Sequence, residues 1–93
     1  MEKKITVIGD FTTMKALEWK EQLNSFAVNF ESLDVDLTQV TDADIIGVNA
    51  LVTTHKLLLA KGRKLKIRMP KKSKISEMLH LTKFSSILIT EEI

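Results

Sequence analysis

The stretch VDLTQVTDADIIGVNAL, residues 35–51, decides the fold. Val35, Asp36 and Leu37 alternate between apolar and polar side chains, which is typical of a strand that is covered on one face. A short polar turn is expected next, and helical apolar periodicity begins at Ile45. Asp44 immediately precedes that helix, so its carboxylate is expected to cap the first, unpaired amides. Junctions of this kind carry the binding sites of open α/β sheets.

The same alternation of strand and helix extends outward from this stretch over the whole chain. Strands are expected at Lys3–Ile8, Leu33–Leu37, Leu65–Met69 and Ser86–Thr90, and helices from Thr12 or Thr13 to about Phe26, from Ile45 to about Lys61 and after Ser73. Short links between such elements favour a mainly parallel sheet with right-handed crossovers. The 93 residues therefore predict a single α/β domain, residues 1–93, with four strands and about three helices.

Two of the expected strands place charged residues at every second position. Asp34 and Asp36 alternate with apolar residues in one strand, and Lys66 and Arg68 do so in another. A sheet buried on both faces has continuous apolar strands instead. We therefore expect the helices mostly on one face, with these four side chains on the other, where opposite charges on neighbouring strands can pair.

The central stretch resembles the core motif of the STAS domain, the fold of sulfate-transporter tails and bacterial anti-sigma factor antagonists. The family pattern is roughly L-D-L-S-x-V-x-x-I-D-S-S-G-L-G-x-L. The matching residues here are Asp36, Leu37, Val40, Asp44, Gly47, Ala50 and Leu51. The segment Ile8–Phe11 resembles the family's strand-ending G-E-L, so the resemblance covers nearly the whole chain and implies a STAS-like fold.

One departure from the family pattern bears directly on function. In anti-sigma factor antagonists a serine that a partner kinase phosphorylates follows the motif aspartate, whereas this chain has Ile45 there and Ile46 next. Ile45 thus marks a lost phosphosite. The family position implies a partner-docking loop, formed by Thr41, Asp42, Asp44, Ile45, Ile46 and Gly47. Its apolar residues would give contact area without a charge switch.

The resemblance also implies the class of partner. We expect a non-catalytic regulatory protein-interaction module in signalling and transcription regulation, with no cofactor, whose partner is a kinase-type anti-sigma factor. The alternative is a small subunit beside the ATPase of a lipid-trafficking ABC transporter, or of a stress-signalling complex. Family members carry an additional N-terminal strand that is not expected here, so an exposed sheet edge would also allow a homodimer.

Charge is divided unevenly along the chain. Residues 1–44 hold nine acidic and four basic residues, a net charge of −5, whereas residues 45–93 hold ten basic and three acidic residues, a net charge of +7. The basic cluster consists of Lys61, Arg63, Lys64, Lys66, Arg68, Lys71, Lys72 and Lys74. Such a cluster raises a further alternative, a nucleic-acid or anionic-surface binder. We favour a solvated strand and loop, because no aromatic residue lies within it to stack on bases.

Motifs of catalysis and of metal binding are missing from the sequence. There is no Walker loop, no G-x-S-x-G and no H-E-x-x-H. His55 lies on an apolar helix face, where a packed histidine is more common than a ligand. Asp42 and Asp44 could bind Mg²⁺, but a turn residue followed by a helix cap explains both. We therefore expect neither enzymatic activity nor a metal. Without cysteines, and with an apolar run of only Ile5–Ile8, we also expect a cytoplasmic protein with no membrane insertion.

Overall fold

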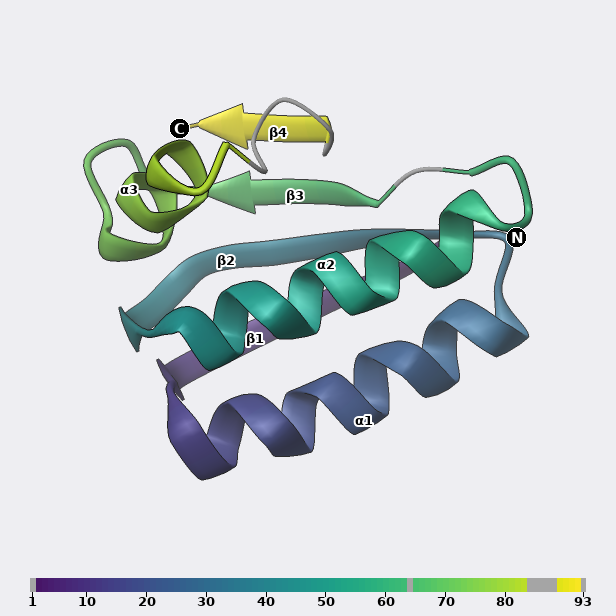
Figure 1. The fold of residues 1–93 in the computed structure, drawn as a ribbon, viewed down its shortest axis with the longest axis horizontal. Coiled ribbons are helices and arrows are strands. Elements are labelled where there is room, and N and C mark those ends of the chain that lie inside the picture. Colours follow the sequence, from purple (N-terminus) through teal and green to yellow (C-terminus); the bar gives the residue numbers. More distant parts are fainter. Residues whose placement is uncertain (1, 64, 84–88, 93) are drawn as a thin grey trace.

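The computed structural model describes residues 2–63, 65–83 and 89–92 and shows alternating strands and helices (Figure 1). The elements are β1 (Glu2–Phe11), α1 (Thr13–Asn29), β2 (Ser32–Ala43), α2 (Ile45–Leu59), β3 (Lys66–Met69), α3 (Lys74–Leu81) and β4 (Ile89–Glu92). The expected α/β fold with three helices and parallel strands β1, β2 and β3 is confirmed. Most of the strand expected at 86–90 lies outside the described residues, and β4 is the strand described there.

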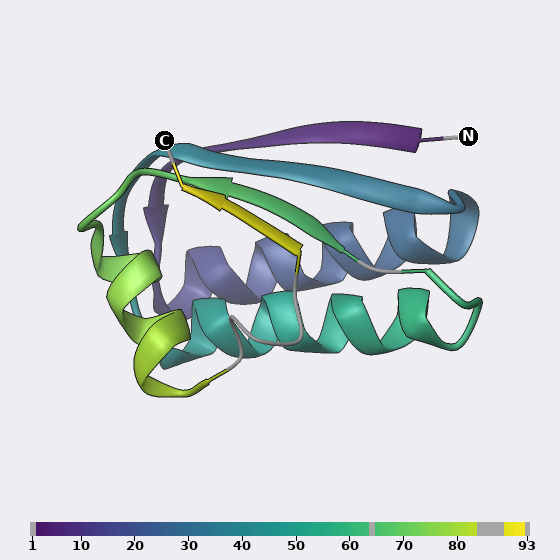
Figure 2. The same cartoon turned by 90° about the horizontal axis from the view of Figure 1, so that it is seen from above.

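The sheet follows the order of the sequence. Its strand order is β1-β2-β3-β4, and each neighbouring pair is parallel. The helices α1, α2 and α3 lie on one face of the sheet, as Figure 2 shows, and no helix of the described residues covers the other face. Because the strands are parallel, their carboxyl ends meet at one edge, where the starts of α1, α2 and α3 also lie (Figure 1).

Two strands are longer than the sequence predicted. Gly9 was expected to end β1, but its positive φ of 83° allows the strand to bend and continue to Phe11, with register shifts against β2 on both sides. β2 continues to Ala43, so the polar turn expected after Leu37 is in fact strand. Only Asp44 separates β2 from α2, which makes the junction tighter than expected.

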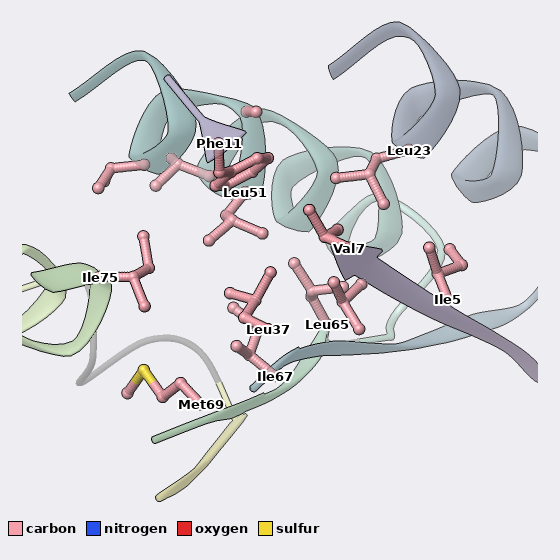
Figure 3. Packing of buried hydrophobic residues seen from close by; sticks show 14 of the residues in the cluster. Ile5, Val7, Phe11, Leu23, Leu37, Leu51, Leu65, Ile67, Met69 and Ile75 are labelled. Carbon is pink, nitrogen blue, oxygen red and sulfur yellow. The ribbon is translucent and has the colours of Figure 1, made fainter. Parts of the chain in front are cut away.

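The core lies between the helices and the sheet (Figure 3). The alternating strands contribute Val35, Leu37, Ile67 and Met69, all fully buried, and α1 contributes the stripe Ala16, Leu23 and Ala27. Helical periodicity also favours core positions for Trp19 and Phe26, but both are only partly buried, at the margin of the core.

The charged residues of β2 and β3 lie on the open face, and opposite charges pair across the two strands as expected. Asp34 lies opposite Lys66 and Asp36 opposite Arg68 in register, yet the ion pair runs diagonally, from Arg68 to the Asp34 carboxylate at 3.7 Å. Asp34 is only 5% exposed, although the open face has no helix. The side chains of Lys4, Thr6 and Arg68 surround it in a small cavity of about 90 Å³.

Candidate functional site

The centre of the candidate site is the carboxylate of Asp44, between β2 and α2. Asp44 has extended backbone angles, and its Oδ1 accepts hydrogen bonds from the backbone N–H groups of Ile46 (3.0 Å) and Gly47 (3.2 Å). These amides belong to the first turn of α2, where the helix supplies no partner of its own. Asp44 is therefore the N-cap of α2, and it fixes the direction in which the helix leaves the sheet.

The same carboxylate also holds the start of α1. Its Oδ2 accepts hydrogen bonds from the backbone N–H of Thr13 (3.0 Å) and from the Thr13 hydroxyl (3.4 Å). Thr12 is the N-cap residue of α1, but its side chain makes no cap bond and its hydroxyl donates to Asp10 instead. Thr13 itself has a φ of +45°, which is rare for a β-branched residue. The starts of α1 and α2 are thus joined through one side chain.

Gly47 allows the end of β1 to approach α2 closely. A Cβ atom at this position would lie 2.7 Å from the backbone oxygen of Phe11 and 2.7 Å from its ring. Neither distance is compatible with a real side chain, and a backbone oxygen cannot move aside as a flexible side chain can. The glycine of the family motif therefore has a packing function here, because only a hydrogen atom fits between α2 and Phe11.

The two isoleucines after the cap differ in exposure. Ile46 packs against the core and is partly buried, whereas Ile45 is 49% exposed. Met14, which follows Thr13 at the start of α1, is 66% exposed. Thr13 and Asp44 are in contact. Met14 and Ile45, the residues that come directly after them, therefore place exposed apolar side chains at the starts of both helices. Because successive residues differ by about 100° around a helix, at least one of the two isoleucines could point outward, and Ile45 is the exposed one.

The remaining residues of the loop border a cavity of about 130 Å³. Its lining consists of Val40, Thr41, Asp42, Ala43, Ser73, Lys74 and Ile75. Lys74 lies 3.2 Å from the Asp42 carboxylate and, together with the Ala43 N–H, holds the pKa of Asp42 below its usual range. The end of β2 is therefore tied to the start of α3, where the Ser73 hydroxyl accepts a hydrogen bond from the Ser76 N–H as an N-cap.

Four residues of the basic cluster have partners in the described part of the chain. Lys61 donates hydrogen bonds to three backbone oxygens at the end of α1, including that of Ala27 at 2.6 Å. Arg63 pairs with Glu31 at 3.8 Å, and Arg68 and Lys74 have the partners named above. Lys64 lies outside the described residues. Much of the cluster thus stabilises the fold.

The candidate metal ligands are engaged in other contacts. Asp42 pairs with Lys74, and Asp44 accepts four hydrogen bonds from backbone and hydroxyl donors. His55 is buried within α2, at 3% exposure. In the part of the chain that the structure describes, no three ligand-type side chains converge on a point where a cation could bind. Likewise, no described helix has the length and hydropathy that a membrane crossing requires.

Sequence reasoning found Asp44, Ile45 and Gly47 but missed their contacts from β1 and α1. Thr13 and Phe11 are more than 30 residues from their partners along the chain, and the sequence contains no periodic signal that relates them. Only the parallel pairing of β1 with β2, which brings the two carboxyl ends together, could have indicated that these residues meet.

Comparison with known proteins defines the class to which this fold and site belong. The STAS domain family model matches residues 3–92, so the chain belongs to the STAS domain family. Among solved structures, it is similar to one described as the anti-sigma factor antagonist SpoIIAA in its unphosphorylated form. The TM-score is 0.70 at 10% identity, and the match covers 96% of this chain and 78% of that one. At that identity the likeness shows a shared fold. A search of curated proteins finds no match.

Proposed function

We propose that this STAS domain is a constitutive docking module, a non-catalytic regulatory protein that binds its partner through residues 41–47, which form the end of β2, the cap Asp44 and the start of α2. We keep the name docking loop for these residues. The family resemblance supports a partner of the kinase-type anti-sigma factor class. Where such antagonists have a serine, this chain has Ile45, which accepts no phosphate. Binding is therefore not released by phosphorylation at that position, and regulation of the complex lies elsewhere.

The observation that carries this proposal is the exposure of Ile45 on a fixed scaffold. The side chain is 49% exposed, while the residue before it is held by four hydrogen bonds. Such rigidity lowers the entropic cost of ordering the surface on binding. Full burial of an isoleucine contributes about 1.5–3 kcal/mol, so covering the exposed half of Ile45 contributes about 1 kcal/mol to binding.

The second candidate function is that of a small subunit beside an ABC-type ATPase, or within a stress-signalling complex. The same exposed start of α2 would serve as the contact in that case, because an apolar surface next to a capped helix fits any protein partner. The two functions differ in the partner and not in the surface. The genes beside this one separate them: a GHKL-type kinase favours the first, and an ABC ATPase favours the second.

We favour both over nucleic-acid or anionic-surface binding. Lys61, Arg63, Arg68 and Lys74 already have partners within the described chain, which lowers the charge available to phosphates. The discriminating measurement is retention on heparin between 50 and 200 mM salt, where about 10³-fold or greater loss of affinity marks multiple phosphate contacts. We expect weak retention that changes little over this range. We also propose a cytoplasmic location without enzymatic activity.

The test of the docking surface is a pair of matched variants measured against the purified partner protein. Ile45→Asp places a carboxylate at the centre of the proposed contact, where it would lose solvation, and should weaken binding by more than tenfold. Leu59→Asp makes the same change at the other end of α2, where Leu59 is 52% exposed, and should leave the affinity unchanged. Equal affinities for the two variants, with both folded, would place the docking surface elsewhere.

A further inference from the structure

A second surface, separate from the docking loop, lies along the outer edge of β1. β1 is the first strand in the sheet order and pairs only with β2, through residues 2–11. Within the described chain no strand lies along its other side. The part of β1 before the register shift between Thr6 and Ile8 therefore presents a row of unpaired backbone N–H and C=O groups, which is a template for one further strand.

Helix α1 extends beyond this edge. In Figure 1, α1 lies outside β1, on the side away from β2. Asn24 marks the side of α1 that faces α2, because its Oδ1 accepts a hydrogen bond from the Thr54 hydroxyl. At 100° per residue, Trp19 and Phe26 lie about 140° and 160° from Asn24, on the outer side of the helix. Both are partly exposed, and the Lys3 ammonium lies 5.4 Å from the centre of the Phe26 ring.

The overhang makes a second copy of this chain a poor occupant of the edge. Two copies paired antiparallel along β1 would have both α1 helices on the same face, each beneath the β1 strand of the other. Paired strands are about 4.8 Å apart, whereas packed helices need about 8–10 Å between their axes. An extended segment that has no helix beneath it can pair with β1 and lie over α1. A second copy of the chain cannot, because its own α1 would need the same space. The geometry therefore disfavours the homodimer that an exposed sheet edge would allow.

The side chains along the edge indicate the chemistry of the segment. On the helix side, an added strand would cover the outer aromatic residues Trp19 and Phe26, which favours apolar residues at alternate positions. Lys4 lies on the open face opposite Asp34 of β2, and its side chain is exposed, so a strand on its other side could also reach it. A carboxylate opposite Lys4 would form a cross-strand pair of opposite charge. Edge lysines also discourage indiscriminate pairing, so the edge is selective for segments that neutralise them.

We propose that the β1 edge and the outer face of α1 together bind an extended segment of a partner protein by strand addition. The segment has apolar residues toward Trp19 and Phe26 and an acidic residue opposite Lys4. This surface is independent of the docking loop, so one STAS domain can hold two partners, or hold one partner at two places.

The test uses a capped eight-residue peptide in which valine alternates with threonine and glutamate, titrated into the purified protein. Trp19 is the only tryptophan of the chain, so its emission reports directly on the covering of α1. We expect saturable binding, a shift of the emission to shorter wavelength, and slower amide exchange in residues 3–8. A peptide of the same composition with its valines grouped together is the control for non-specific contact.

Variants of the protein then assign the surface. Phe26→Ser should weaken peptide binding at least fivefold, whereas Val28→Ser, at a position of α1 that is 65% exposed, should not change it. Lys4→Glu should weaken binding of the glutamate peptide and strengthen binding of its lysine counterpart, which keeps the test valid if Phe26→Ser fails to fold.

Three results would overturn the proposal. The first is a peptide affinity weaker than about 1 mM. The second is equal binding of the alternating and grouped peptides. The third is a dimer in sedimentation experiments whose formation shifts the Trp19 emission, because a second copy would then occupy the edge.

Discussion

Replacement of Asp44 by alanine tests the idea that one carboxylate holds two helices. Asp44→Ala removes the acceptor for the Ile46 and Gly47 amides of α2 and, at the same time, the acceptor for the Thr13 amide of α1. Loss of one N-cap costs about 1 kcal/mol, so loss of both should cost about 2 kcal/mol. In a domain of this size that lowers the melting temperature by about 8–16 °C.

The two contributions can be separated with a shorter capping residue. In Asp44→Ser the hydroxyl oxygen can still accept a hydrogen bond from the first turn of α2, but there is no second oxygen to accept one from Thr13. Asp44→Ser should therefore lose only about half as much unfolding free energy as Asp44→Ala. Thermal and urea unfolding, followed by circular dichroism and by Trp19 emission, measures each variant. A loss below about 0.5 kcal/mol for Asp44→Ala, or full restoration by serine, would contradict the shared cap.

Three further predictions concern the surroundings of this cap. Gly47→Ala should cost about 1–3 kcal/mol of unfolding free energy because its Cβ would overlap Phe11, and urea denaturation measures it. Two hydrogen bonds donated by Thr38, from its hydroxyl and its backbone N–H, hold the pKa of Asp36 below its usual range. A carboxylate whose pKa is lower in the folded state stabilises the fold at pH values above its unfolded-state pKa of about 4. This stabilisation is lost as the pH falls through the folded-state pKa. Asp36→Asn should therefore flatten the acid limb of a plot of unfolding free energy against pH. Lys61→Met should lower stability by about 0.5–1 kcal/mol, because the end of α1 loses its cationic donor, with fraying of that end visible in amide exchange.

The periodicity of the sequence was sufficient to predict the layout of the fold. Strict alternation in residues 33–37 and 65–69 predicted strands with one covered face, and the helices do lie on one face (Figure 2). Asp44 directly precedes the first apolar residue of α2, and its side chain does accept hydrogen bonds from the backbone N–H groups of the first turn. These features depend on neighbours in the sequence, and local patterns report on such neighbours well.

Features that depend on distant contacts could not be predicted in the same way. The partly exposed position of Trp19 follows from where α1 lies relative to the edge of β1, and helical periodicity alone places it in the core. The diagonal pair of Arg68 with Asp34 depends on side-chain reach across two strands, and the strand register alone indicates other partners. In the sequence Lys61 is one of a cluster of basic residues. Its hydrogen bonds to the end of α1 depend on the packing of α1 against α2, which local sequence patterns do not indicate.

Amide hydrogen exchange of the chain, alone and with its bound partner, tests the docking proposal most directly. Protection on binding is expected to be concentrated in residues 41–50, at the end of β2 and the first turns of α2, and Ile45→Asp should abolish it. The docking surface would be refuted by a partner complex of undiminished affinity in which residues 41–50 exchange as fast as in the free protein while protection appears elsewhere.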